Sequence, residues 1–244
     1  MKFKAVLFDL DGTLLDTIDD LADSMNSVLE MFGFPKHGID KYKYFVGDGM
    51  DVLVRRALPV SCKDESIIAG CVAAMKEEYS SRWADKTRPY DGIPELLDSL
   101  SASGVRLSIL SNKPHEPTGI VVSRMLADWN FEMVVGVRDG VPRKPDPAAA
   151  ILIANSLEIA PDEFLYLGDT NTDMKTAVAA GMFPAGALWG FRTADELILA
   201  GARILVRHPA DLLDFIWFPP GNSPFERSRS QSAGFLVRHI LRMP

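Results

Sequence analysis

Short apolar runs alternate with longer helical patterns along most of the chain, and this alternation is the feature that most constrains the fold. The apolar runs lie at residues 5–8, 106–110, 133–137, 164–167 and 203–206. Helical signals lie between them; at residues 94–100 a proline begins a leucine-rich stretch, and Gly104 follows its end. Strands separated by helices pair in parallel and carry helices on both faces. The sequence therefore predicts an α/β fold with a doubly wound parallel sheet.

One long interval interrupts this alternation. Residues 16–83 contain no convincing strand, but helical patterns occupy 18–32, 50–57 and 65–82, with glycines and a proline between them. We expect a helical insertion into the α/β unit. The expected division is a core domain of residues 1–15 and 87–216, an inserted all-helical cap domain of residues 16–86 with hinges near 15–17 and 86–90, and a C-terminal tail of residues 217–244.

Composition excludes several classes of protein. The formal net charge of -7 argues against a general nucleic-acid or membrane-surface binder, because both need a basic face. Two cysteines do not make a disulfide framework, which favours a reducing compartment. The N-terminal apolar run is too short for a signal peptide, and no run has membrane-spanning length. We expect a cytoplasmic protein with no nucleic-acid or membrane partner.

Polar side chains gather where the predicted strands end. They are Asp9 and Asp11 after the first strand, Ser111, Asn112 and Lys113 after the second, Lys144 before a later helix, and Asp169 and Asp173 after the fourth strand. In an open α/β sheet the carboxyl ends of the strands share one edge, where ligands bind. These side chains are therefore expected to meet in one crevice.

The chemistry of this set points to phosphoryl transfer. Three crowded carboxylates, Asp9, Asp169 and Asp173, would repel one another unless a hard cation lay among them, and oxygen ligands of this kind suit Mg²⁺. A phosphate also needs a cation and hydrogen-bond donors, which Lys144, Ser111 and the backbone N–H groups of residues 10–13 can supply, so that Thr13 is a candidate phosphate-binding residue. An aspartate can then attack phosphorus while a second carboxyl protonates the leaving oxygen.

Four motifs in order carry a resemblance to a known family. They are FDLDGTLLDT at residues 8–17, SNKP at 111–114, KPDP at 144–147, and the pair Gly168-Asp169 with Asp173. Over roughly residues 1–216 the sequence resembles the haloacid dehalogenase-like (HAD) hydrolases, and within them the phosphoglycolate phosphatase group with a helical, C1-type cap. The resemblance implies a Rossmann-like core.

The resemblance also implies a role for each motif residue. Asp9 would be the nucleophile that becomes an aspartyl-phosphate, and Asp11 the general acid and base. The phosphoryl group would be bound by Ser111 and Lys144, with Asn112 lining its pocket and Thr13 positioning the Asp11 side chain. Mg²⁺ would be held by Asp9, the Asp11 backbone carbonyl and Asp169, with Asp173 a direct or water-mediated ligand.

The predicted cap contains a second candidate site. Gly47 and Gly49 flank an aspartate before a helix, which indicates either a plain loop or exposed N–H groups that bind an anionic leaving group. Lys43, Arg55 and Arg56 are alternative partners for a substrate carboxylate. Similar segments in the resembled group face the active site, so substrate choice is expected to depend on the cap.

The expected function is hydrolysis of a small phosphorylated metabolite, with 2-phosphoglycolate favoured. The alternatives are a hexose-phosphate mutase, a pyrophosphatase or nucleotidase of the same superfamily, and a non-enzymatic binding or regulatory protein on this scaffold. A dehalogenase or a phosphonatase is disfavoured because Asp11 is present. The sequence does not choose between a monomer and a homodimer.

Overall fold

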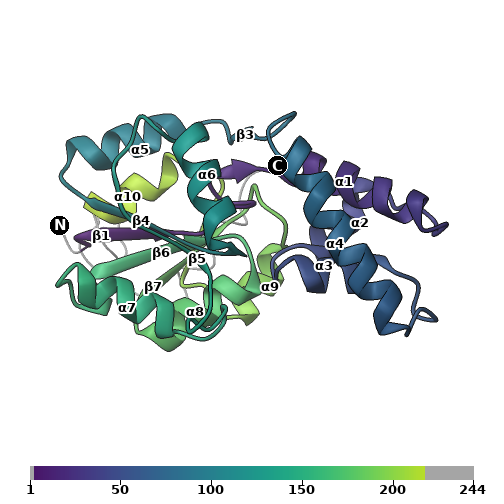
Figure 1. Ribbon diagram of the computed structural model, residues 1–244. Helices are drawn as coiled ribbons and strands as arrows, with labels where there is room; N and C mark the ends of the chain where they lie inside the picture. Colours follow the sequence, from purple (N-terminus) through teal and green to yellow (C-terminus); the bar gives the residue numbers. More distant parts are fainter. Residues whose placement is uncertain (1–2, 218–244) are drawn as a thin grey trace, which may run out of the picture.

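The computed structural model describes residues 3–217 and contains a six-stranded sheet, in the order β5-β4-β1-β6-β7-β8, with every pairing parallel (Figure 1). The strands are β1 (Ala5–Phe8), β4 (Arg106–Pro114), β5 (Phe131–Val137), β6 (Phe164–Gly168), β7 (Phe183–Ala187) and β8 (Ile204–Val206). The predicted α/β class and parallel sheet are confirmed. Five of these strands were predicted, whereas β7 was not.

Helices cover both faces of the sheet (Figure 1). Alternate residues of β1 point to opposite faces. Val6 and Phe8 pack in one cluster with helices α5 (Ile93–Ala102), α6 (His115–Met125) and α10 (Asp211–Trp217). Ala5 and Leu7 pack on the other face with α7 (Ala148–Ser156) and α8 (Asn171–Ala180), while α9 (Ala194–Leu199) covers the β7–β8 edge. Because β1 is buried on both sides, the residue that follows it is held firmly.

Four further helices form a unit beside the sheet (Figure 1). They are α1 (Ile18–Met31), α2 (Ile39–Phe45), α3 (Met50–Ala57) and α4 (Glu65–Arg82). This helical unit has its own core, in which Met25 of α1, Val54 of α3 and Met75 of α4 are buried. The Asp64 carboxylate caps α4 by accepting a hydrogen bond from the N–H of Ser66 at 2.8 Å.

A short two-stranded ribbon joins the helical unit to the sheet. It pairs β2 (Leu15–Asp16) with β3 (Arg88–Pro89), and neither strand was predicted. The buried carboxylate of Asp20 accepts the backbone N–H of Lys86 at 3.0 Å and of Thr87 at 2.8 Å. Since Asp20 lies in α1, this contact ties the two crossing segments together.

No helix within residues 3–217 is both long and apolar enough to cross a membrane. The predicted tail of residues 217–244 lies, apart from Trp217, outside the described residues.

Candidate active site

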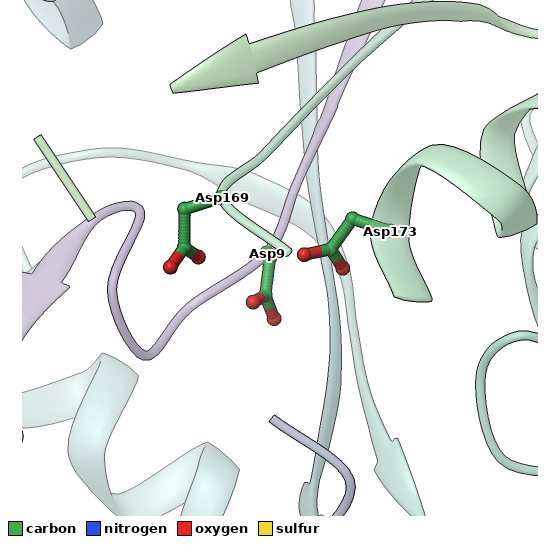
Figure 2. Close-up of side chains that lie close together, drawn as sticks. All are labelled: Asp9, Asp169 and Asp173. Carbon is green, nitrogen blue, oxygen red and sulfur yellow. The ribbon is translucent and has the colours of Figure 1, made fainter. Parts of the chain in front are cut away.

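Three carboxylates meet at the carboxyl edge of the sheet. Figure 2 shows the side chains of Asp9, Asp169 and Asp173 close together. One oxygen of each carboxylate lies within 4.8 Å of the others. Asp9 follows β1 and Asp169 follows the neighbouring strand β6, while Asp173 lies in the first turn of α8. The parallel order of the strands therefore brings these predicted residues together.

Lys144 lies among these carboxylates and is almost fully buried, with its side chain 2% exposed. Its Nζ donates to Asp9 Oδ1 at 2.7 Å and to Asp173 Oδ1 at 2.6 Å. Burial alone would lower the pKa of Lys144, but the charges of Asp173 and Asp9 outweigh it and the pKa is raised. The ammonium group is therefore a fixed positive charge beside Asp9.

The carboxylates themselves are costly to ionise at this place. Burial, followed by the charge of Asp173, raises the pKa of Asp9 well above its ordinary value. Burial and Asp173 likewise raise the pKa of Asp169 to about 7. One lysine does not neutralise three buried carboxylates, so the donor set fits a divalent cation with a preference for oxygen ligands.

Asp169 is held by neighbours that leave it no freedom to turn. Its Oδ1 accepts from the Thr13 hydroxyl at 2.8 Å, and its Oδ2 accepts from the N–H of Phe191 at 2.8 Å. A Cβ on Gly12, where φ is +92°, would lie 2.4 Å from Asp169 Oδ2. Thr13 thus contacts Asp169 in place of Asp11, which corrects the prediction that Thr13 positions the Asp11 side chain.

Asp173 combines a structural contact with its place in the cluster. Its Oδ2 accepts from the N–H and hydroxyl of Thr170, at 3.0 and 2.6 Å, which forms a capping box at the start of α8. Its Oδ1 accepts from Lys144 and, at 3.3 Å, from the Tyr166 hydroxyl. Both oxygens are therefore already engaged with protein donors.

Ser111 and Asn112 lie at the end of β4, next to β1. Ser111 is buried, and its hydroxyl oxygen accepts the N–H of Lys113 at 3.2 Å. The Asn112 amide donates to the carbonyls of Lys144 and Gly47, both at 3.1 Å, and its Oδ1 accepts the N–H of Lys144 at 2.9 Å. Asn112 thus fixes the Lys144 loop and contacts the helical unit.

Lys113, which was expected in the crevice, and Tyr79, which was not, complete this edge. Lys113 Nζ donates to Asp11 Oδ1 at 2.7 Å and to the hydroxyl of Tyr79 at 3.0 Å. Burial would lower the pKa of Lys113, but Asp11 and Tyr79 outweigh it and leave the pKa raised. The sequence predicted the place of Lys113 but no role for it, whereas Tyr79 lies in an apolar helical pattern that gave no functional signal.

A cavity of about 60 Å³ lies between the helical unit and the strand ends. The sheet side contributes Asp9, Asp11, Ser111, Asn112, Lys113 and Pro114, and the helical unit contributes Leu21, Val46, Gly47, Gly49, Met50, Leu53 and Tyr79. Gly47 and Gly49 therefore do face the cluster. The wall supplied by the helical unit is mainly apolar.

The basic residues proposed for a substrate carboxylate point elsewhere. Arg55 binds Glu65 at 2.6 Å, Arg56 binds Asp48 at 2.6 Å, and Lys43 lies 3.7 Å from Asp40. Within the described part of the chain, none of the three lines the cavity. Their charges are engaged within the helical unit.

Arg192 joins the helical unit to the loop after β7. Its guanidinium donates to the backbone carbonyl of Lys43 and, at 2.8 Å, to that of Val46, at the C-terminal end of α2. A second contact runs from the Thr172 hydroxyl to Asp48 Oδ1 at 2.9 Å. Both contacts hold the Gly47–Gly49 loop over the carboxylates.

Residues 6–187 match the family model described as haloacid dehalogenase-like hydrolase. The chain belongs to the haloacid dehalogenase-like hydrolases. Phosphoglycolate phosphatase 1 of Pseudomonas aeruginosa is 32% identical over 214 residues, covering 86% of this chain and 78% of the relative. The N-acetylmuramic acid 6-phosphate phosphatase of the same species is 31% identical, covering 88% and 96%.

A solved structure from Lactobacillus delbrueckii subsp. bulgaricus shares this haloacid dehalogenase-like fold, with a TM-score of 0.83 and 28% identity. The similarity covers 88% of this chain and 99% of that one. The predicted membership of the haloacid dehalogenase-like hydrolases and similarity to their phosphoglycolate phosphatase group are confirmed, and so is the predicted enzyme class, a phosphatase. The C1 type of the cap stays a prediction.

Proposed function

We propose that this phosphatase is a Mg²⁺-dependent phosphomonoester hydrolase that acts through an aspartyl-phosphate on a small phosphorylated metabolite. The observation that carries the proposal is the contact of Lys144 with Asp9 at 2.7 Å inside a cluster of three buried carboxylates. A buried lysine beside an aspartate at a strand end suits the binding of a phosphate at that aspartate.

In this proposal Asp9 is the nucleophile. Its carboxylate oxygen attacks phosphorus, the bond from phosphorus to the ester oxygen breaks, and the product alcohol leaves. Lys144 offsets the negative charge of the incoming phosphoryl oxygens, and Ser111 donates its hydroxyl to one of them. Asp11 gives its proton to the leaving oxygen, then takes a proton from the water that hydrolyses the aspartyl-phosphate.

Mg²⁺ would be held by Asp9, Asp169 and the backbone carbonyl of Asp11. When bound, it supplies the positive charge that lets phosphate approach an aspartate. Each oxygen of Asp173 accepts two protein hydrogen bonds, whereas each oxygen of Asp169 accepts one. We therefore propose Asp169 as a direct ligand, and propose that Asp173 contacts the metal through water and orients Lys144.

The favoured substrate is 2-phosphoglycolate. Support comes from the small cavity and from several relatives named phosphoglycolate phosphatase, including a Yersinia pseudotuberculosis protein 31% identical over 227 residues. Because another relative is named N-acetylmuramic acid 6-phosphate phosphatase, a larger phosphorylated sugar acid is the second candidate substrate. The alternative activities are those of a hexose-phosphate mutase, a pyrophosphatase and a nucleotidase, each of which would use the same carboxylates.

The helical unit is proposed to act as a cap that closes over the substrate, with residues 16–86 as its extent and the chain acting as a monomer or homodimer. Its loop at Gly47 reaches Asn112, which supports a role in covering the site. Its apolar wall would exclude water from the reacting phosphate.

A screen of phosphate esters with Mg²⁺ tests this proposal. The panel holds 2-phosphoglycolate, N-acetylmuramic acid 6-phosphate, nucleotides, sugar phosphates and pyrophosphate, with phosphate release as the readout. We expect the highest kcat/KM on 2-phosphoglycolate, loss of turnover in EDTA, and recovery with Mg²⁺. Isomerisation of a hexose phosphate without phosphate release would refute the hydrolase in favour of the mutase.

Asp9→Asn should abolish turnover, because an amide is a poor nucleophile. Asp11→Asn should allow slow or no turnover with Mg²⁺ binding largely intact, since the proposed metal contact of Asp11 is its backbone carbonyl. Activity of more than a few per cent in Asp9→Asn would contradict the assignment of the nucleophile.

A further inference from the structure

We infer that Lys113 and Tyr79 position the Asp11 side chain, so that the general acid is held in place only while the helical unit is docked. The inference rests on the proposed function, because the role of Asp11 as acid and base is assigned there. Lys113 and Tyr79 are positioning residues in this scheme, since they act through Asp11.

The side chains of Tyr79, Lys113 and Asp11 form a chain of contacts from the helical unit to the sheet. The Tyr79 hydroxyl, in α4, accepts from Lys113 Nζ at 3.0 Å, and the same Nζ donates to Asp11 Oδ1 at 2.7 Å. The Nζ also lies 4.9 Å from the centre of the Tyr79 ring, within the range of a cation–π contact. Tyr79 thus contacts the lysine through both its hydroxyl and its ring.

The contacts of Lys113 with Asp11 and Tyr79 are largely shielded from water. The side chains of Lys113 and Asp11 are 7% and 14% exposed, and all three residues line the cavity. A buried ion pair is weak evidence for stability, because desolvation of the two charges offsets their attraction. The contact of Lys113 with Asp11 is to Oδ1, which leaves Oδ2 to carry the proton that the proposed general acid delivers.

This chain of contacts joins the helical unit to the sheet. Asp11 and Lys113 belong to the sheet side, whereas Tyr79 belongs to the separate core of the helical unit. If the helical unit moved away, Lys113 would lose its hydroxyl and ring partner and would be exposed to water. Lys113, and Asp11 with it, would then be free to turn, and a phosphate at Asp9 would lack a placed acid.

The test separates positioning of the acid from general support of the fold. p-Nitrophenyl phosphate has a leaving group that needs no proton, whereas the alcohol of 2-phosphoglycolate does. The variants are Tyr79→Phe, which keeps the ring, and Lys113→Met. Tyr42→Phe is the matched control, because the Tyr42 hydroxyl donates to Asn26 at 2.7 Å inside the helical unit.

First-turnover rates at saturating ester are measured by rapid quench for 2-phosphoglycolate and by p-nitrophenol release for p-nitrophenyl phosphate. We expect the 2-phosphoglycolate rate to fall about a hundredfold in Lys113→Met, the lower end of the range for loss of a general acid. In Tyr79→Phe, which removes only the support of Lys113, the rate should fall less, by about tenfold. The p-nitrophenyl phosphate rate should change less than about threefold in both, and Tyr42→Phe should not separate the two esters.

Three results would overturn the inference: equal losses on both esters, no loss on either, or a rise only in the KM for 2-phosphoglycolate. The last would make Lys113 a ligand of the substrate carboxylate. Failure of the proposed function differs from all three, because the unmodified protein would then release no phosphate from either ester with Mg²⁺.

Discussion

Without the proposed Mg²⁺, the protein should lose stability as the pH rises from about 5 to 8. Burial and the charge of Asp173 raise the pKa of Asp169 from 3.8 to about 7. The folded protein therefore keeps a proton on Asp169 at pH values where the unfolded chain has lost it. Stability falls with rising pH wherever the folded state binds more protons, so the metal-free protein loses free energy of unfolding across this interval.

The magnitude follows from the two pKa values. One pKa unit corresponds to about 1.4 kcal/mol, so Asp169 accounts for a loss on the order of 4 kcal/mol between acid and pH 8. About half of that loss, roughly 2 kcal/mol, falls between pH 5.5 and 8, because the folded-state pKa is about 7, and for a chain of this size it lowers the melting temperature by roughly 5 °C. The raised pKa of Asp9 acts in the same direction. Bound Mg²⁺ should reverse the loss, because it favours the ionised carboxylates.

The assay is thermal unfolding between pH 5.5 and 8, in EDTA and in excess Mg²⁺. The stabilisation by Mg²⁺ should grow with pH, and Asp169→Asn, which has no carboxylate to titrate there, should lose the part of the dependence that comes from Asp169. A metal-free protein whose melting temperature rises over this interval, with the same slope in Asp169→Asn, would refute the electrostatic reasoning.

Two further substitutions test the supports of the site. Gly12→Ala should lower the free energy of unfolding by about 1–3 kcal/mol and weaken Mg²⁺ activation, because its Cβ would displace Asp169; Gly104→Ala, at φ +72° with no atom within 4 Å, is the control. If Gly12→Ala were activated by Mg²⁺ at the same concentrations as the unmodified protein, the proposed displacement of Asp169 would be contradicted. Arg192→Ala should raise KM by at least about tenfold, because it removes two charged hydrogen bonds that dock the helical unit, each worth about 1.5–3 kcal/mol, and about 1.4 kcal/mol is a factor of ten. An unchanged KM would show that the contact does not hold the unit closed.

The sequence predicted the sheet wherever strands were rich in aliphatic residues. The run at residues 164–167 became β6 because its residues are buried on both faces. The strand β7 was missed because its sequence FPAGA contains a proline, a glycine and two alanines, which are weak strand signals. The β2–β3 ribbon was missed because two-residue strands are created by the crossing of distant segments and leave no local pattern.

The sequence located the motif residues more readily than the contacts between them. Asp9, Asp169 and Asp173 could be grouped because their strands share an edge. The pairing of Thr13 with Asp169 depends on loop conformation, which residue spacing does not specify. The role of Tyr79 was not predicted because the residue lies in an apolar helical pattern. From sequence alone, a tyrosine with a buried ring cannot be distinguished from other core residues, because the partner of its hydroxyl is not known.

The contact of Arg192 with two backbone carbonyls has a consequence for how such enzymes diversify. Every amino acid supplies a carbonyl, so the partners of Arg192 survive replacement of the side chains at Lys43 and Val46. The lining of the helical unit could then accumulate substitutions that suit new esters while its attachment to the sheet persists. Libraries for altered substrate preference should keep Arg192 fixed and vary Leu21, Met50 and Leu53.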